Sequence, residues 1–249
     1  MPMPPALPPM GAVPKIPLPS GELLETGIQG FDALIGGGLR PSSNVLLLGP
    51  PGIEKFVFGL QFAWQAFAKK QPVIYITTDL APLEIENKGS EFGWRFFSYT
   101  NRGLSFIDCY SWTLGTPPAD RKDIQVPGPS ALNDLSIGVT QAIQEHYKPQ
   151  QKSRVIIQSV STLLLYNPPE VVFRFTQITG ARLKSVEATT LWHLEAGMHD
   201  DKTVTTLKHL MDGVIEMKQE GGKNFLQAPL HGLKEWREFV VTPQGIALV

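Results

Sequence analysis

The stretch Asn44-Val45-Leu46-Leu47-Leu48-Gly49-Pro50-Pro51-Gly52-Ile53-Glu54-Lys55-Phe56 decides the fold. Residues 44–48 are an apolar run without alternation, which is typical of a strand buried on both faces. Glycine and proline then interrupt the run, and the residues that follow include Phe58, Phe62 and Phe67 among the apolar positions of a helix. The order is therefore strand, glycine-containing loop and helix.

Strands continue to alternate with helices toward the C-terminus. Further strands are predicted at residues 73–78, 104–108, 154–158 and 188–194, and helices at about 82–92, 130–143 and 169–185. Residues 115–129 are rich in proline and are expected to form a loop, with Ser130 capping the helix that follows. From Gly213 onward the apolar period is two, and Gly221-Gly222 is a hairpin turn signal. We therefore expect an α/β fold, with a mostly parallel twisted sheet, flanking helices and a C-terminal antiparallel extension.

Two regions precede the first strand. Residues 1–20 contain eight prolines, which predicts an extended or disordered N-terminal arm, either a free leader or an arm that docks on a neighbouring subunit. Residues 21–249 are expected to form a single domain. Near its start, a short amphipathic helix with apolar Phe31, Leu34 and Ile35 is predicted before Gly36-Gly37-Gly38.

The composition excludes several classes of protein. The chain has 249 residues, with 22 Lys+Arg and 23 Asp+Glu, so its formal net charge of −1 gives no broad basic surface for nucleic acid. The single cysteine, Cys109, excludes an internal disulfide framework and a cysteine-based zinc cluster. No apolar run approaches the ~18 residues of a membrane span, and the start lacks the charged region of a signal peptide. A cytoplasmic protein without membrane attachment is expected.

Residues 49–56 follow only part of the phosphate-binding pattern Gly-x-x-x-x-Gly-Lys-Ser/Thr. Gly49 and Lys55 match it, but Glu54 replaces the second glycine and Phe56 replaces the hydroxyl residue. Glu54 adds a carboxylate where phosphate would bind, and a phenyl ring cannot ligate Mg²⁺. The strand at 154–158 ends in Gln158, where the partner motif has a metal-binding Asp. The candidate nucleotide-binding residues are Gly49, Pro50, Pro51, Gly52, Ile53, Glu54, Lys55 and Phe56.

The segment Thr26 to Gly38, with the sequence TGIQGFDALIGGG, resembles the opening T-G-I-x-G-L-D-x-L-x-G-G-G of the KaiC-like branch of the RecA superfamily of ATPases. Further similar stretches are 49–52, 75–79, 92–94, 107–108, 213–216 and 239–246, so the resemblance covers about residues 20–249. It implies a RecA-like P-loop NTPase fold. It also implies ATP binding at the subunit interfaces of a ring, often a hexamer.

The resemblance identifies two more departures. The family usually places two adjacent glutamates at the end of the second strand, and this chain has Asp79 followed by Leu80. The family often supplies a basic finger to the neighbouring subunit from a Lys-x-Arg-Gly stretch. Here the counterpart, residues 229–232, leaves only His231 for that contact. Phosphoryl transfer depends on positioning and charge neutralisation, so the combined losses argue against Mg²⁺-dependent hydrolysis.

Three functions remain open. The first is a KaiC-like protein with an impaired ATPase site, acting as a regulatory or assembly module by self-association or with a related ATPase or another protein. The second is a slow ATP hydrolase that uses Lys55 and Asp79. The third is a recombinase-like DNA-binding protein, which the near-zero charge disfavours. The sequence establishes no cofactor, ATP or ADP binding stays open, and the lost ligands count against Mg²⁺.

Each candidate residue could also have a purely structural role. Lys55 is expected to pair with Glu54 or Asp79 if it does not bind phosphate, and Asp79 to be a solvated carboxylate at a strand end. Gln158 is expected to be a hydrogen-bonded polar group. The acidic and histidine residues at 193–200 fit no standard metal motif, so no metal site is predicted there.

Overall fold

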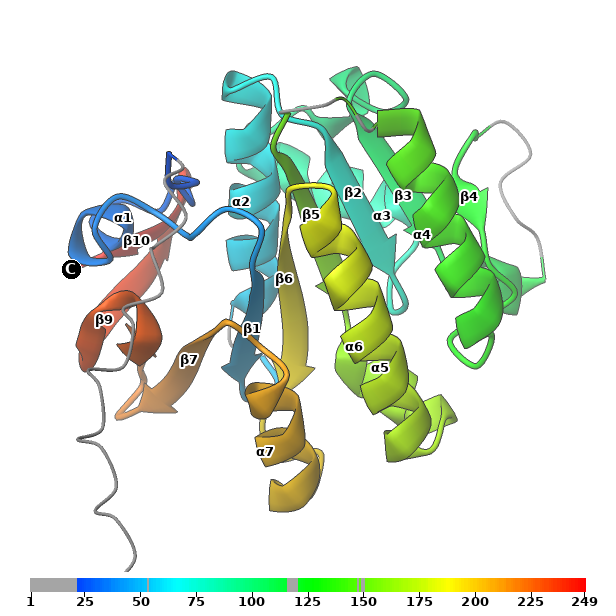
Figure 1. Ribbon diagram of the computed structural model, residues 1–249. Coiled ribbons are helices and arrows are strands. Elements are labelled where there is room, and N and C mark those ends of the chain that lie inside the picture. Colours follow the sequence, from blue (N-terminus) through cyan, green and yellow to red (C-terminus); the bar gives the residue numbers. More distant parts are fainter. Residues whose placement is uncertain (1–21, 53, 116–120, 147, 149–150) are drawn as a thin grey trace, which may run out of the picture.

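A ten-stranded sheet runs through the part of the protein that the computed structural model describes, residues 22–52, 54–115, 121–146, 148 and 151–249 (Figure 1). Its strands are β1 Asn44–Gly49, β2 Val73–Thr77, β3 Leu104–Asp108, β4 Ile124–Gln125, β5 Ser153–Gln158, β6 Ala188–Glu195, β7 Gly213–Glu220, β8 Lys223–Ala228, β9 Leu233–Thr242 and β10 Gly245–Leu248. The helices are α1 Phe31–Leu34, α2 Lys55–Ala68, α3 Pro82–Glu91, α4 Leu132–His146, α5 Val160–Tyr166, α6 Pro169–Ser185 and α7 Asp201–His209, with short 3₁₀ turns at Phe96–Ser98, Ser111–Leu114 and Pro229–His231.

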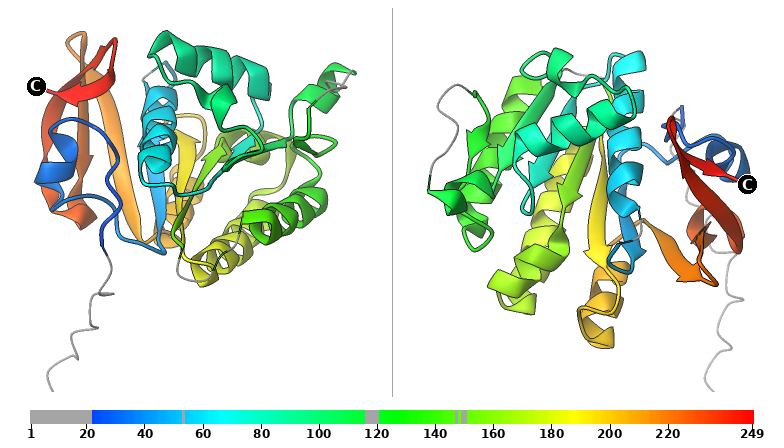
Figure 2. Two further views of the ribbon diagram at one scale, coloured as in Figure 1. Left: turned by 90° about the horizontal axis from the view of Figure 1, so that it is seen from above. Right: turned by 180° about the vertical axis from the view of Figure 1, so that it is seen from behind.

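The strand order is β10-β9-β8-β7-β1-β6-β5-β2-β3-β4. Neighbouring strands in the run β7-β1-β6-β5-β2-β3-β4 are parallel. Neighbouring strands in the run β7-β8-β9-β10 are antiparallel. The expected α/β fold, with a mostly parallel sheet, flanking helices and an antiparallel C-terminal extension, is confirmed. The antiparallel strands carry the sheet beyond β7, on the side where α1 lies (Figure 2).

Helices cover both faces of the sheet and divide its apolar side chains into two cores (Figure 2). Strand β1 shows the division, because Val45 and Leu47 enter the core under α1, α2 and α3, whereas Leu46 and Leu48 enter the core under α4 to α7. Successive strand side chains point to opposite faces, so only a continuous apolar run can fill both cores. This burial explains the unbroken apolar sequence of the central strands.

Several elements differ from the sequence prediction. Helices α5 and α7 were not predicted, and β4 lies inside the expected loop at 115–129. Ser130 does not cap α4, because the carbonyl of Ala131 accepts the first helical hydrogen bond, from Leu135, and Ser130 stands one residue too early. Leu34, expected on the apolar face of α1, is exposed. The arm predicted at residues 1–20 lies outside the described residues.

A terminal clasp joins residues near the start of the domain to the last strand. The amide of Leu248 donates to the carbonyl of Gln29 at 2.9 Å. The side chain of Gln61, on α2, donates to the carbonyl of Gly27 at 2.7 Å and accepts from the amide of Ile246 at 2.7 Å. These five residues, Gly27, Gln29, Gln61, Ile246 and Leu248, therefore connect segments that are far apart in sequence.

One strand residue in the core is an arginine. Arg154, on β5, is 1% exposed, and its guanidinium donates to the carbonyls of Glu25 at 2.6 Å and Phe62 at 2.8 Å and to the side chain of Gln71 at 2.9 Å. It also lies over the Phe62 ring, 4.6 Å from the centroid. Burial lowers the pKa of Arg154 to about 10, and the charges of Asp32 and Glu25 oppose that shift. The guanidinium thus links β5 to α2 and to the N-terminal segment.

No described helix is both long enough and apolar enough to span a bilayer.

We expect Arg154→Met to lower the free energy of unfolding by about 3 kcal/mol, since it removes the three hydrogen bonds that the buried guanidinium donates. Arg182→Met is the matched control, because the Arg182 guanidinium is only half-buried and donates to the carbonyl of Ser136 and the hydroxyl of Thr140. Its cost should stay near 1 kcal/mol in urea denaturation. Equal losses in the two variants would contradict the assigned role of Arg154.

Candidate functional site

A cleft of about 370 Å³ opens where the carboxyl ends of β1, β2, β5 and β6 meet. Open α/β sheets bind ligands at this edge. The cleft is lined by Gly52, Glu54, Lys55, Phe56, Asp79, Leu80, Lys88, Gln158, Ser159, His193 and Glu195. The structure therefore brings together the predicted loop, Asp79 and Gln158, and adds Lys88, His193 and Glu195 to them.

Lys55 is the first residue of α2 and is 3% exposed. Its ammonium donates to the carbonyl of Gly49 at 2.8 Å, to the carbonyl of Pro50 at 2.6 Å and to a carboxylate oxygen of Glu195 at 2.8 Å. An ammonium has three donors, so all of them are satisfied within the chain. The prediction that Lys55 pairs with Glu54 or Asp79 is wrong, because its ion pair is with Glu195, at the same edge of the sheet.

The strand register explains why Glu195 is the partner. Strand β6 lies beside β1 in the sheet, and Glu195 is the residue opposite Gly49. The backbone amide of Glu195 donates to the hydroxyl of Ser161, on α5, at 2.8 Å, and this bond holds the strand end. Burial lowers the pKa of Lys55, whereas the hydrogen bond and charge of Glu195 raise it. The carboxylate therefore offsets part of the desolvation of the ammonium.

The loop between β1 and α2 presents its remaining side chains differently. Gly52 has a φ of +77°, a left-handed conformation that suits glycine, whereas Ile53 lies outside the described residues. Glu54 directly precedes α2, and its side chain makes no ion pair with a described residue. Phe56 packs partly against the core under α2, with the Lys88 ammonium 5.9 Å from its ring centroid. The position that would supply a metal-binding hydroxyl is therefore occupied by an apolar contact.

Asp79 and Gln158 are both held by hydroxyl groups. Asp79 accepts from Thr78 at 2.8 Å and from Thr162 on α5, so the half-buried carboxylate is hydrogen-bonded within the chain as well as partly exposed. The helix α5 was missed from the sequence, and it supplies that second donor. Gln158 is 8% exposed and accepts from the hydroxyl of the buried Tyr75. Both side chains thus belong to fixed hydrogen-bond networks.

His193 is the least solvated titratable residue of the cleft, at 2% exposure. Its Nε2 has no hydrogen-bond partner among the described residues, and a Cβ placed on Gly59 of α2 would lie 2.7 Å from that atom. Burial, reinforced by the nearby charge of Lys55, lowers the pKa of His193 to about 3. The imidazole is therefore neutral at physiological pH.

The other predicted residues lie elsewhere. His231 packs against Gly213 at the amino end of β7, opposite the cleft within this chain, and it lines a hollow with Arg40. Asp200 caps α7 by accepting from the amide of Thr203 at 2.8 Å. Among the described residues, no three His, Cys, Asp or Glu side chains gather as a metal site would require.

A family model described as ATPase: KaiC matches residues 24–234. The chain belongs to this KaiC family of ATPases. The family resemblance of the opening motif is therefore confirmed, together with membership of the RecA superfamily. Which of the family's activities this member retains is a separate question.

The curated relatives include both short and long proteins. The chain is 27% identical over 201 residues to a UPF0273 protein of Methanopyrus kandleri, covering 79% of this chain and 76% of the relative. A UPF0273 protein of Thermotoga maritima is 26% identical over 199 residues, 78% of each chain. The circadian clock oscillator protein KaiC of Parathermosynechococcus lividus is 32% identical over 173 residues, 69% of this chain and 30% of the clock protein.

Below about pH 6.5, we expect His193 to make the protein less stable as the pH falls. The folded pKa of about 3 lies below the ordinary value, so the unfolded chain binds a proton that the folded chain does not. Between pH 7 and pH 5 this linkage costs about 2 kcal/mol. Urea denaturation at both pH values should show that wild type loses about that much more stability than His193→Gln. If wild type and His193→Gln lose equal stability between the two pH values, groups other than His193 cause the pH dependence.

Proposed function

We propose that this chain is a KaiC-family protein with an impaired ATPase site, which acts as a regulatory or assembly module. The observation that carries the proposal is the ion pair between Lys55 and Glu195. In an active site of this kind, the lysine neutralises phosphate charge. Here the ammonium is already shared by a carboxylate and the carbonyls of Gly49 and Pro50.

The charges of the cleft support the same proposal. Three carboxylates line it, those of Glu54, Asp79 and Glu195, against the two ammonium groups of Lys55 and Lys88. A triphosphate would meet net negative charge, and like charges repel strongly in a partly dry site. Phe56 and Gln158 offer Mg²⁺ neither a hydroxyl nor a carboxylate. These residues do not fit a metal-bound triphosphate, so we derive no hydrolytic step.

A slow ATP hydrolase is the second candidate. Asp79 lines the same cleft as Lys55 and is held in place by the Thr162 hydroxyl, which favours a retained general base. A loose nucleotide site completed by a neighbouring subunit, with His231 as the contact from that subunit, belongs to this alternative. The proposals differ in whether the chain turns over ATP at all.

We expect Glu195→Gln to bind ATP or ADP at least about tenfold more tightly than wild type, because it removes a negative charge that repels phosphate and neutralises the Lys55 ammonium. Glu54→Gly should act in the same direction by removing the loop carboxylate. Glu187→Gln, at the other end of β6, is the matched control and should leave affinity unchanged. Isothermal titration calorimetry with and without Mg²⁺ measures all four proteins.

The hydrolase alternative is tested by measuring phosphate release. Mg²⁺-dependent phosphate release by wild type that Asp79→Asn abolishes would overturn the impaired-site proposal. Wild-type affinity equal to that of Glu195→Gln would show that the ion pair does not obstruct the site.

Assembly is the positive part of the proposed role. Large apolar side chains stand exposed on the helices that cover one face of the sheet, namely Ile137, Leu165, Tyr166, Val171 and Ile178. Exposed apolar surface on one layer of helices favours burial against a partner. A self-associated ring, or a mixed assembly with a related ATPase, would bury it.

We expect the purified chain to sediment as an oligomer and Leu165→Glu to shift it toward the monomer, since Leu165 is 62% exposed. Gln141→Glu adds the same charge to α4 without removing apolar surface and serves as the control. Sedimentation velocity over a concentration series gives the masses. A wild-type monomer throughout would leave mixed assembly with another protein as the surviving form of the proposal.

A further inference from the structure

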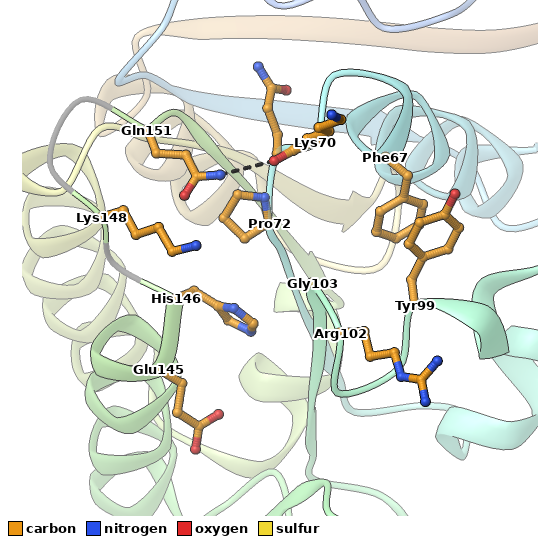
Figure 3. Close-up of a pocket in the computed structure, with 11 residues that line it drawn as sticks. Phe67, Lys70, Pro72, Tyr99, Arg102, Gly103, Glu145, His146, Lys148 and Gln151 are labelled. Atoms are coloured by element: carbon orange, nitrogen blue, oxygen red, sulfur yellow. Dashed lines mark hydrogen bonds between the residues drawn. The ribbon is translucent and has the colours of Figure 1, made fainter.

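A second concavity, the amino-edge pocket, lies at the opposite edge of the sheet from the cleft (Figure 3). It has a volume of about 310 Å³ and forms beside the amino ends of β2, β3 and β5. The residues that carry the argument are Phe67, Lys70, Tyr99, Arg102, His146 and Lys148. They come from the ends of α2 and α4 and from the loops before β3 and β5, so four separate segments build the pocket.

The pocket is positively charged. Lys70, Arg102 and Lys148 line it, and Glu145 is the one acidic residue among the described residues of the lining. None of these three cations lies within ion-pair distance of a described carboxylate, whereas Lys55 and Arg121 elsewhere in the chain are paired. A concavity lined by unneutralised cations concentrates anions. The excess of cations in the amino-edge pocket is opposite in sign to the charge of the cleft, where carboxylates outnumber ammonium groups.

The scaffold of the pocket is held by internal contacts. The Gln151 side chain donates to the carbonyl of Lys70 at 2.9 Å, which ties the loop before β5 to the loop before β2. Nε2 of His146 lies 2.7 Å from the hydroxyl of Ser105, which fixes the imidazole. Burial lowers the pKa of His146, so the positive charge at neutral pH comes from the lysines and the arginine.

An aromatic wall completes the pocket. Phe67 and Tyr99 stack with their ring centroids 3.9 Å apart and their planes within 3°. Figure 3 shows Tyr99 and Arg102 on one side of the pocket and Lys148 and His146 on the other. The lining therefore combines cationic side chains on two sides of the pocket with an aromatic wall on one of them.

We propose that the amino-edge pocket binds a small phosphorylated ligand with an apolar or planar portion. Lys70, Arg102 and Lys148 supply the positive charge that attracts the phosphate, because guanidinium and ammonium groups form charge-assisted hydrogen bonds to its oxygens. Tyr99 contacts the rest of the ligand. The volume of about 310 Å³ and the near-neutral chain favour a small molecule over a nucleic acid, which needs an extended basic surface. The site is separate from the cleft and independent of its proposed function.

The test uses phenyl phosphate and inorganic phosphate as probes at constant ionic strength. Binding is followed by calorimetry and by the fluorescence of Trp64, whose ring centroid lies 5.8 Å from those of both Phe67 and Tyr99. Phenyl phosphate should bind more tightly than inorganic phosphate. Arg102→Gln and Lys148→Gln should each weaken it about tenfold or more.

Matched variants separate binding in the pocket from binding elsewhere on the protein. Lys152→Gln removes the same charge from the same loop as Lys148 but outside the pocket, and it should leave affinity within about twofold. Lys88→Gln removes an exposed cation from the cleft and should leave phenyl phosphate binding unchanged. The proposal is overturned by no binding at millimolar concentrations, by equal weakening in Lys152→Gln, or by loss of binding in Lys88→Gln. Tighter, steeply salt-dependent binding of an oligonucleotide would replace it with a nucleic-acid surface.

Discussion

The buried ammonium of Lys55 is the constraint on which the cleft depends. Its hydrogen bonds to the carbonyls of Gly49 and Pro50 fix the loop after β1, and its ion pair with Glu195 fixes the end of β6. Because Lys55 is the first residue of α2, the same contacts fix the start of that helix. A buried charge that lost one of these partners would be costly to keep, because desolvation already disfavours it. The loop therefore has a conformation that is satisfied from within the protein. The same arrangement uses all three donors of the ammonium within the chain.

The architecture was largely predictable, since each central strand must supply apolar side chains to two cores and leaves an unbroken apolar run in the sequence. Helices α5 and α7 were missed because they have only 7 and 9 residues, too few for a clear apolar period. The partner of Lys55 could not be predicted, because Glu195 becomes its neighbour only through the adjacency of β1 and β6. Strand order is a three-dimensional property that local pattern does not contain.

Buried charges were likewise invisible in the sequence. Arg154 lies within an otherwise apolar part of its strand, and Arg121 pairs with Glu86 and Asp123 although the next residue, Lys122, is exposed. The signs of charge also separate along the strands, with carboxylates in excess at the carboxyl edge and cations in excess at the amino edge. A formal net charge of −1 therefore conceals two edges of opposite character.

The terminal clasp has a consequence for the order in which the chain acquires its structure. Gln29 and Leu248 are separated by nearly the whole domain, so their contact closes a very long loop of chain. Closing a longer loop costs more chain entropy, and such a contact forms readily only after the intervening strands and helices have brought its ends together. During synthesis, the segment around Gly27 cannot complete its hydrogen bonds to Gln61 and Leu248 until residues 245–248 have been made. We therefore expect the parallel half of the sheet to assemble first and the clasp to complete the fold.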